Sequence, residues 1–336
     1  MNIVKTMGTI AARLGRPAPL SLTFELTHLC NLACDYCDRH TPMSNEMTRE
    51  QILKALEEFI DLGTRKVKFD GGEPLAHKHI DEFVAWLIER DISTGMNTNG
   101  ILVPKKIETV RQLSQVRISL DGPRDNHDSM RGKGSFDKAI RGAVAARDAG
   151  VPKVDFTCVI GKHNANAIDE LIDLVEELEL SVIFQPARPS LFLGNDRDGK
   201  AFVPNQSEIM TAFGRVESRK RQGKAVGNRW SSLRHFRSLP RDVNLPCAAG
   251  WIHVTMDPEG SLYHCGQIAR QDASNNVTRL GARAAFDGLS RKGCTQCWCA
   301  RVVERNYTWG LRYDKLLPMM DEPVISDPSP TPSATP

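Results

Sequence analysis

The stretch Cys30-Asn31-Leu32-Ala33-Cys34-Asp35-Tyr36-Cys37 holds three cysteines at the spacing C-x3-C-x2-C, directly after the apolar segment Leu22–Leu26. Three thiolates this close together are suited to one soft metal centre. No fourth cysteine follows in the neighbouring sequence. A closed structural zinc or iron–sulfur site normally uses four protein ligands, whereas a catalytic site keeps one position open. The loop therefore predicts a metal centre with a vacant coordination position.

The composition sets outer limits on the class of protein. The chain has 336 residues, of which 40% are hydrophobic and 25% charged, enough for one large domain or two smaller ones. A net charge of +3 and the lack of basic runs interleaved with aromatics give no indication of nucleic-acid binding. No apolar run is long enough to predict a membrane span, and no signal peptide is apparent. We therefore interpret the nine cysteines as metal ligands in a reducing cytoplasm.

Beyond the cysteine loop, helical and strand patterns alternate. The apolar spacing predicts helices over 48–61, 80–90, 105–113, 136–149 and 167–178, and strands over 66–70, 93–97, 116–120, 153–160 and 182–185. With the strand before the cysteines, this alternation predicts a parallel sheet covered by helices. Ligand sites in such sheets lie at the carboxyl ends of the strands. The cysteines, the segment 71–74, the segment 97–100 and Asp121-Gly122 each follow a strand.

With Glu25-Leu26-Thr27 before it, the cysteine loop resembles the signature loop of radical S-adenosylmethionine (SAM) enzymes. In that family three cysteines hold a [4Fe-4S] cluster, and the amino and carboxylate groups of SAM chelate the open iron. The resemblance implies that Cys30, Cys34 and Cys37 are ligands in an α/β fold, a partial (β/α)6 barrel. It also implies reductive cleavage of SAM to a 5′-deoxyadenosyl radical that abstracts hydrogen from a substrate, with electrons from a flavodoxin- or ferredoxin-type donor.

Several residues are candidates for contacts with SAM. Paired glycines at Gly71 and Gly72 allow close backbone approach, and Glu73 offers a carboxylate for an ammonium group. By resemblance this segment binds the amino group of SAM, and Tyr36 borders the adenine. Asn97 sits where ribose hydroxyls would be bound, although Asn-rich turns also form without a ligand.

The segment from Ile118 to Pro123, with Arg131 beyond it, resembles the fourth-strand region of radical SAM enzymes that carry a C-terminal SPASM or Twitch extension. In those enzymes the positions of Ser119 and Arg131 reach the carboxylate of SAM, for which a guanidinium provides two parallel donors. We interpret Asp121 and His127 as turn and capping residues.

A second group of cysteines lies near the C-terminus. Cys247, Gly260 and Cys265 match the opening of SPASM and Twitch modules, and residues 252–264 predict a β-hairpin. The resemblance implies one auxiliary [4Fe-4S] cluster held by Cys247, Cys265, Cys294 and Cys297. Too few further cysteines remain for a full SPASM module, which favours the shorter Twitch form. Structural zinc is the alternative metal. For Cys299 a spectator thiol, a replacement ligand and a hydrogen-atom donor all remain open.

The predicted organisation has five parts. These are an N-terminal amphipathic helix in 1–19, the barrel in 20–190, a connector in 191–243, the auxiliary module with a C-terminal helix in 244–320, and a disordered Pro/Ser/Thr tail in 321–336. The N-terminal helix packs on the protein or contacts a membrane surface or a partner. Peptide-modifying members often carry a recognition domain before the barrel, and few residues precede the first strand here. We therefore expect a small-molecule substrate, with a ribosomal-peptide maturase and a non-catalytic SAM-binding scaffold as alternatives.

Overall fold

The computed structural model describes residues 17–37, 45–188, 202–239, 247–266, 273–291 and 297–309. The predictions for the helix within 1–19, for Cys294 and for the tail lie wholly or largely outside these residues. No helix within the described ranges is long and apolar enough to cross a bilayer.

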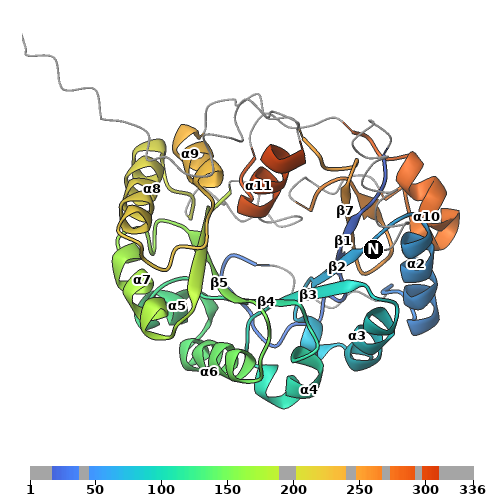
Figure 1. The fold of residues 1–336 in the computed structure, drawn as a ribbon, viewed down its shortest axis with the longest axis horizontal. Coiled ribbons are helices and arrows are strands. Elements are labelled where there is room, and N and C mark those ends of the chain that lie inside the picture. The colour runs from blue at the N-terminus through green and yellow to red at the C-terminus, as the bar shows by residue number, and fades with distance from the viewer. Residues whose placement is uncertain are drawn as a thin grey trace, which may run out of the picture.

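Six parallel strands follow one another in space in their sequence order. They are β1 Ser21–Glu25, β2 Lys66–Asp70, β3 Ser93–Thr98, β4 Gln115–Ser119, β5 Val154–Ile160 and β6 Ser181–Pro186. The sheet curves round a central space, and β6 and β1 are not paired (Figure 1). The predicted partial (β/α)6 barrel is thus confirmed.

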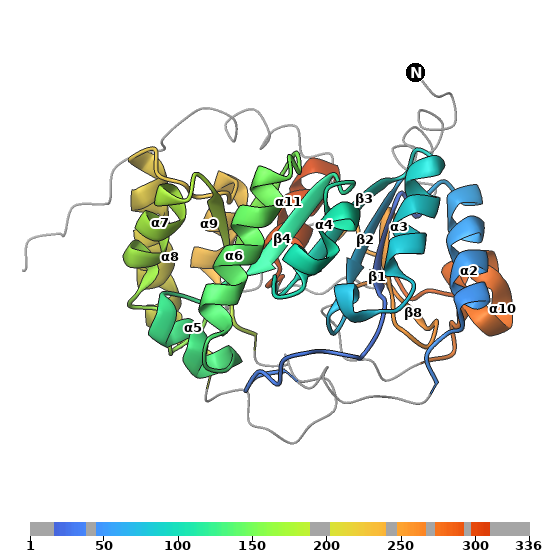
Figure 2. The ribbon, with the colours of Figure 1, turned by 90° about the horizontal axis from the view of Figure 1, so that it is seen from below.

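Helices cover the outer face of the curved sheet (Figures 1 and 2). The helices of the described chain are α2 Arg49–Asp61, α3 Ile80–Glu89, α4 Ile107–Val110, α5 Arg124–Arg131, α6 Ser135–Asp148, α7 Ile168–Glu177, α8 Gln206–Arg221, α9 Trp230–Ser238, α10 Val277–Asp287 and α11 Ala300–Trp309, of which α11 does not belong to this outer layer. Two short 3₁₀ segments, Pro74–Ala76 and Val103–Lys106, accompany them. The capping box of Thr48 and Gln51 forms at the start of α2 as predicted.

Some helical segments differ from the prediction. The helix expected over 105–113 is a 3₁₀ segment followed by the four-residue α4, because the chain after Val110 continues in tight three-residue turns. Helix α5 was not predicted because it is strongly polar and buries only His127 and Met130. Helix α9 lies in the region predicted as a connector.

Alternation along the strands separates two environments. Apolar residues such as Phe24, Phe69 and Ile118 are fully buried in the core shared with the helices. Their neighbours along the strands, including Lys68 and Arg117, face a cavity inside the barrel. This period-two pattern gives the barrel an apolar outer layer and a polar interior.

The predicted C-terminal hairpin is present as β7 His253–Met256 and β8 Leu262–Tyr263. Strand β7 also pairs in parallel with β1, Ser21 opposite His253, so the hairpin extends the barrel sheet rather than standing apart from it. Helix α11 packs against α9 and β6, on the open side of the barrel (Figure 1).

Candidate SAM and iron–sulfur site

The start of the cysteine loop is bound to the loop that follows β2. The N–H of Leu26 donates to the carbonyl of Asp70 at 2.9 Å. In the reverse direction, the Gly72 N–H donates to Thr27 O at 2.7 Å, and the Glu73 N–H donates to Leu29 O at 2.8 Å. Three backbone hydrogen bonds therefore make the two loops one unit.

The paired glycines are required by this contact. A Cβ on Gly71, whose φ is +120°, would lie 2.7 Å from Thr27 O, and a Cβ on Gly72 would lie 2.3 Å from Leu29 O. Neither position admits a side chain without moving the backbone. The close approach predicted from the sequence is thus made, in the described structure, to the cysteine loop itself.

The Glu73 carboxylate is completely buried. It accepts hydrogen bonds from Thr98 Oγ1 at 2.7 Å, from the Asn99 N–H at 2.8 Å and from the Leu75 N–H at 3.1 Å. Burial raises the pKa of this carboxyl to about 7 despite these donors. The Glu73 carboxylate therefore accepts hydrogen bonds from groups of the protein itself. The binding of the SAM ammonium group by the segment Gly71–Glu73 stays a prediction.

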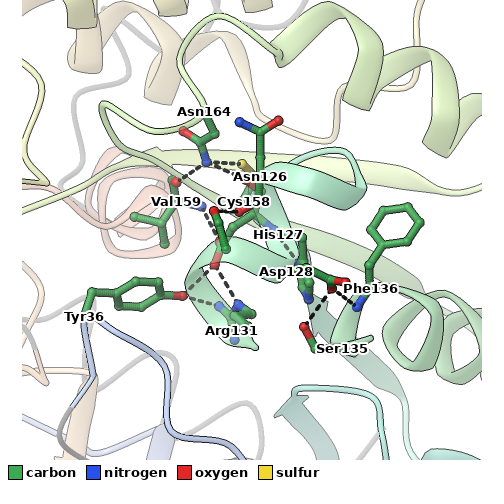
Figure 3. Close-up of polar contacts among 12 residues, drawn as sticks. Tyr36, Asn126, His127, Asp128, Arg131, Ser135, Phe136, Cys158, Val159 and Asn164 are labelled. Atoms are coloured by element: carbon green, nitrogen blue, oxygen red, sulfur yellow. Dashed lines mark hydrogen bonds and ion pairs between the residues drawn. The ribbon is translucent and has the colours of Figure 1, made fainter. Parts of the chain in front are cut away.

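The far end of the cysteine loop is bound to α5 and to the end of β4. The Asp35 N–H donates to Met130 O at 3.0 Å. The Tyr36 hydroxyl donates to Asp121 Oδ2 at 2.6 Å, and the Arg131 guanidinium donates to the Tyr36 hydroxyl. Figure 3 shows the Tyr36 and Arg131 side chains pointing toward each other. Arg131 is thus held beside the cysteine loop.

Asp121 is the residue whose importance the sequence did not reveal. Its side chain is fully buried and accepts from Arg131 Nε at 2.6 Å. Its carbonyl accepts from Asn164 Nδ2 at 2.6 Å, and its N–H donates to His127 Nδ1 at 3.1 Å. His127 therefore has the capping contact expected of it, whereas Asp121 also forms a buried ion pair.

The three thiols of the loop share one electrostatic environment. Burial raises the pKa of Cys30 and raises that of Cys34 to about 11, and the charges of the other loop thiols add to this effect. The nearby Arg131 guanidinium acts in the opposite direction on both thiols. A cation held beside the loop favours the thiolate form that iron–sulfur ligation requires.

The residues of the loop suit a [4Fe-4S] cubane, in which each thiolate binds a different iron. The spacing, the mutual influence of the thiols and the adjacent cation all suit that group.

Asn97 and Ser119 lie at the ends of β3 and β4, as predicted. Asn97 Nδ2 donates to Asp70 Oδ2 at 2.9 Å, while its buried Oδ1 has no hydrogen-bond partner among the described residues. Ser119 is half-buried and lies opposite Thr157 of β5. It is the neighbouring Asn99, not Asn97, that reaches the cysteine loop, through Asn31 Oδ1 at 2.6 Å.

A cavity of about 210 Å³ lies inside the barrel. Its wall includes Gly71 and Asn97, and also Cys265 and Cys299. It therefore borders both the candidate SAM site and the second group of cysteines.

The second group of cysteines also comes together. Cys247, Cys297 and Cys299 pack against a small cluster of Cys265, Ala249 and Val302. The structure thus places Cys299 with three of the predicted ligands, the fourth, Cys294, being outside the described residues. The three roles left open for Cys299 by the sequence stay predictions.

Comparison with known proteins identifies the family. A family model described as Radical SAM superfamily matches residues 24–175. MftC, the mycofactocin maturase of Mycobacterium tuberculosis, is 28% identical over 75% of this chain and 65% of its own length. The PqqA peptide cyclase of Xanthomonas euvesicatoria is 27% identical over 84% of this chain and 74% of its own length. A probable GTP 3′,8-cyclase of Methanosarcina mazei is 35% identical, over 49% of this chain and 53% of its own length.

Solved structures agree on the fold. The structure of anSMEcpe with bound AdoMet superposes with a TM-score of 0.64 at 20% identity, over 80% of each chain. Streptococcus suis SuiB bound to S-adenosylmethionine gives 0.59 at 18% identity, over 76% of this chain and 64% of its own. The present chain spans about half to three quarters of the curated relatives described above. Residues 24–175 form a radical SAM domain, the domain of an enzyme family that uses SAM and a [4Fe-4S] cluster.

Proposed function

We propose that this enzyme binds SAM at a [4Fe-4S] cluster held by Cys30, Cys34 and Cys37, and abstracts hydrogen from a substrate in the barrel cavity. The supporting observation is the way the cysteine loop is held. Hydrogen bonds join the ligand loop to the Gly71–Glu73 segment at one end and to Asp121 and α5 at the other.

The bound cluster and SAM would supply the one-electron chemistry, and the chain's residues would bind and orient them. In this proposal the Gly71–Glu73 backbone takes the amino group of SAM, and Ser119 and Arg131 take its carboxylate. Arg131 retains donors beyond those given to Asp121 and Tyr36, since a guanidinium carries five N–H groups. Asn97, whose Oδ1 is unpartnered within the described chain, would accept from a ribose hydroxyl, and Tyr36 would border the adenine.

The second cysteine group would hold an auxiliary [4Fe-4S] cluster. We assign Cys247, Cys265, Cys294 and Cys297 as its ligands, with Cys299 as the alternative to Cys297. The packing of four of these five thiols around Ala249 and Val302 supports this assignment. A cluster there would border the substrate cavity, because Cys265 lines it. It would thus be placed to assist oxidation of the substrate or to position it.

Two substrate classes remain as candidates. One is the small molecule expected in the sequence analysis. A peptide substrate is favoured by a different observation: the relatives that align over three quarters or more of this chain, MftC and the PqqA peptide cyclase, are named as maturase and peptide cyclase. In either case we propose a flavodoxin- or ferredoxin-type electron donor in the cytoplasm.

The test is iron content together with SAM cleavage. Anaerobically reconstituted protein should hold about eight irons per chain, the content of two cubanes, and should form 5′-deoxyadenosine from SAM and dithionite. Replacing Cys30, Cys34 and Cys37 together by Ala should abolish cleavage and retain about four irons. Replacing the buried Cys158, which packs in the apolar core, by Ser serves as the matched control. Cleavage by the triple variant would contradict the proposal.

A further inference from the structure

The cavity inside the barrel carries an excess of positive charge. Lys68 of β2, Arg117 of β4, and Arg301 and Arg305 of α11 line it. The carboxylates that line it are Glu25 and Asp70. These cations come from separated parts of the chain and meet only because α11 packs on the open side of the barrel.

Two of these basic groups are buried with hydrogen-bonding capacity unused, and burial and then Arg301 hold the pKa of Lys68 well below its usual value. Lys68 is 4% exposed and Arg117 is 8% exposed. Among the described residues neither Lys68 Nζ nor Arg117 Nε has a hydrogen-bond partner, although Arg117 lies 3.5 Å from Asp155. Buried donors are nearly always satisfied, and a buried charge without an acceptor is costly. Lys68 Nζ and Arg117 Nε can therefore each donate a hydrogen bond to a further acceptor, while Arg117 keeps its ion pair with Asp155.

Two of the carboxylates near these basic groups, Asp70 and Asp155, already accept hydrogen bonds from other donors. Asp70 accepts from Asn97 Nδ2 and from the Gly71 N–H. Asp155 accepts from Gln115 Nε2 at 2.8 Å and from Ser181 Oγ at 2.9 Å. These hydrogen bonds hold the two carboxylates against the strands. Neither carboxylate can turn toward Lys68 without losing them.

The cations repel one another. Burial and then Arg301 lower the pKa of Arg117 to about 10, and burial and Arg301 likewise lower the pKa of Arg305 to about 10. His253 of β7 lines the same cavity, is 3% exposed, and has no partner for either ring nitrogen within the described chain. Burial and the two arginines of α11 keep its pKa well below the usual value, so it is a neutral imidazole able to donate one hydrogen bond.

We propose that Lys68, Arg117, Arg301, Arg305 and His253 form a binding site for an oxyanion group of the substrate, a carboxylate or a phosphate. This rests on the proposed function in one respect, that the barrel cavity receives the substrate. An oxyanion supplies several acceptor lone pairs, and guanidinium and ammonium groups are its usual partners. The anion would also anchor the substrate within the cavity, which borders both the candidate SAM site and the second cysteine group.

One rival explanation is that the cations offset the negative charge of an auxiliary cluster. Cys265 and Cys299 line the same cavity, and their thiolate charges act on Arg305. The two explanations differ in one respect. A counter-charge to the cluster would be satisfied once the cluster is bound, whereas a substrate site would still take an anion afterwards.

The experiment is calorimetric titration of the anaerobically reconstituted protein with pyrophosphate and, separately, with tricarballylate. We expect one of the two to bind, and the Lys68→Met and Arg117→Gln variants to bind it about tenfold or more weakly. Lys54→Met, at a side chain 77% exposed on α2, is the matched control and should bind like the wild type. Binding of pyrophosphate alone identifies a phosphate site, and binding of tricarballylate alone a carboxylate site.

Three results would overturn the proposal. They are no binding of either anion, equal binding by wild type and Lys68→Met, and binding that is lost once the clusters are reconstituted. A melting experiment without anion guards against misfolding, since removing an unpartnered buried cation should not lower the Tm of Lys68→Met. Formation of 5′-deoxyadenosine by the wild type is measured separately. If the protein binds the anion but does not cleave SAM, the anion-site proposal stands and the proposed radical chemistry is contradicted.

Discussion

Asp121 Oδ2 and Arg131 Nε lie 2.6 Å apart, and this ion pair joins the end of β4 to the last turn of α5. Because the Tyr36 hydroxyl donates to the same carboxylate oxygen, the pair also fixes the end of the cysteine loop. The position of Arg131, next to the thiols whose ionisation it favours, thus depends on Asp121.

Asp121→Asn should destabilise the protein strongly, since it leaves Arg131 buried without its counter-charge. Breaking a buried pair typically costs about 3–5 kcal/mol, measurable by urea unfolding. Asp137→Asn, which breaks the exposed pair with Arg124, should cost less than about 1 kcal/mol. Burial raises the pKa of Asp121, but the charge of Arg131 and the hydrogen bonds that Asp121 accepts lower this pKa by more. The net pKa of Asp121 is therefore below its usual value. The contribution of the pair is therefore complete above the unfolded pKa and is lost as the pH falls through the folded value.

Gly72→Ala should separate the cysteine loop from the loop after β2, because the added Cβ would lie 2.3 Å from Leu29 O. We expect reduced iron incorporation after reconstitution and a lower Tm. Gly214→Ala is the control: this glycine lies in α8 with open space around it, and alanine there should stabilise the helix by about 0.5–1 kcal/mol. Full iron content in Gly72→Ala would show that the contact between the loops is dispensable.

Glu73 should make the stability of the cluster-free protein decrease as the pH rises. Burial raises the pKa of its carboxyl from 4.5 to about 7, so the folded state holds a proton that the unfolded state releases. The loss of folding stability caused by ionising Glu73 is absent below pH 4.5 and grows between pH 4.5 and pH 7. Above pH 7 it reaches about 3 kcal/mol. Glu73→Gln should remove this part of the slope in urea unfolding measured from pH 4.5 to 8. An unchanged slope would mean that the hydrogen bonds from Thr98, Asn99 and Leu75 outweigh burial.

Cys265→Ser should remove the auxiliary cluster selectively. Iron content should fall from about eight to about four per chain, while formation of 5′-deoxyadenosine persists and turnover of the substrate is damaged. Cys158→Ser, in a core position beside Asn164, should keep the full iron content. Retention of all the iron by Cys265→Ser would remove this thiol from the ligand set.

The order of strands and helices in the barrel followed from local patterns alone. The alternation of Lys66–Asp70 and the capping box at Thr48 are written in a few neighbouring residues, and the structure reproduces both. Helix α5 was not predicted, because its buried residues are too few to produce a helical spacing of apolar residues. The pairing of β7 with β1 was not predicted, because no local sequence pattern indicates a contact between distant segments.

The candidate site divides in the same way. The cysteine loop and the Gly71–Glu73 segment are short motifs and were visible in the sequence. The role of Asp121 depends on Arg131 reaching back from α5, and the charged cavity depends on α11 bringing Arg301 and Arg305 to face Lys68. Such juxtapositions are products of tertiary packing, so individual residues carry no sign of them.

The parallel pairing of β1 with β7 bears on how the protein is made at the ribosome. Strand β1, which leads into the cysteine loop, acquires its second neighbour only when residues from the opposite part of the chain have been synthesised. Until then the nascent barrel presents an uncovered strand edge, the kind of surface that promotes misassembly. Long-range pairing of this sort is also slow to form. The strand that carries the ligand loop is therefore completed late, after translation has passed His253.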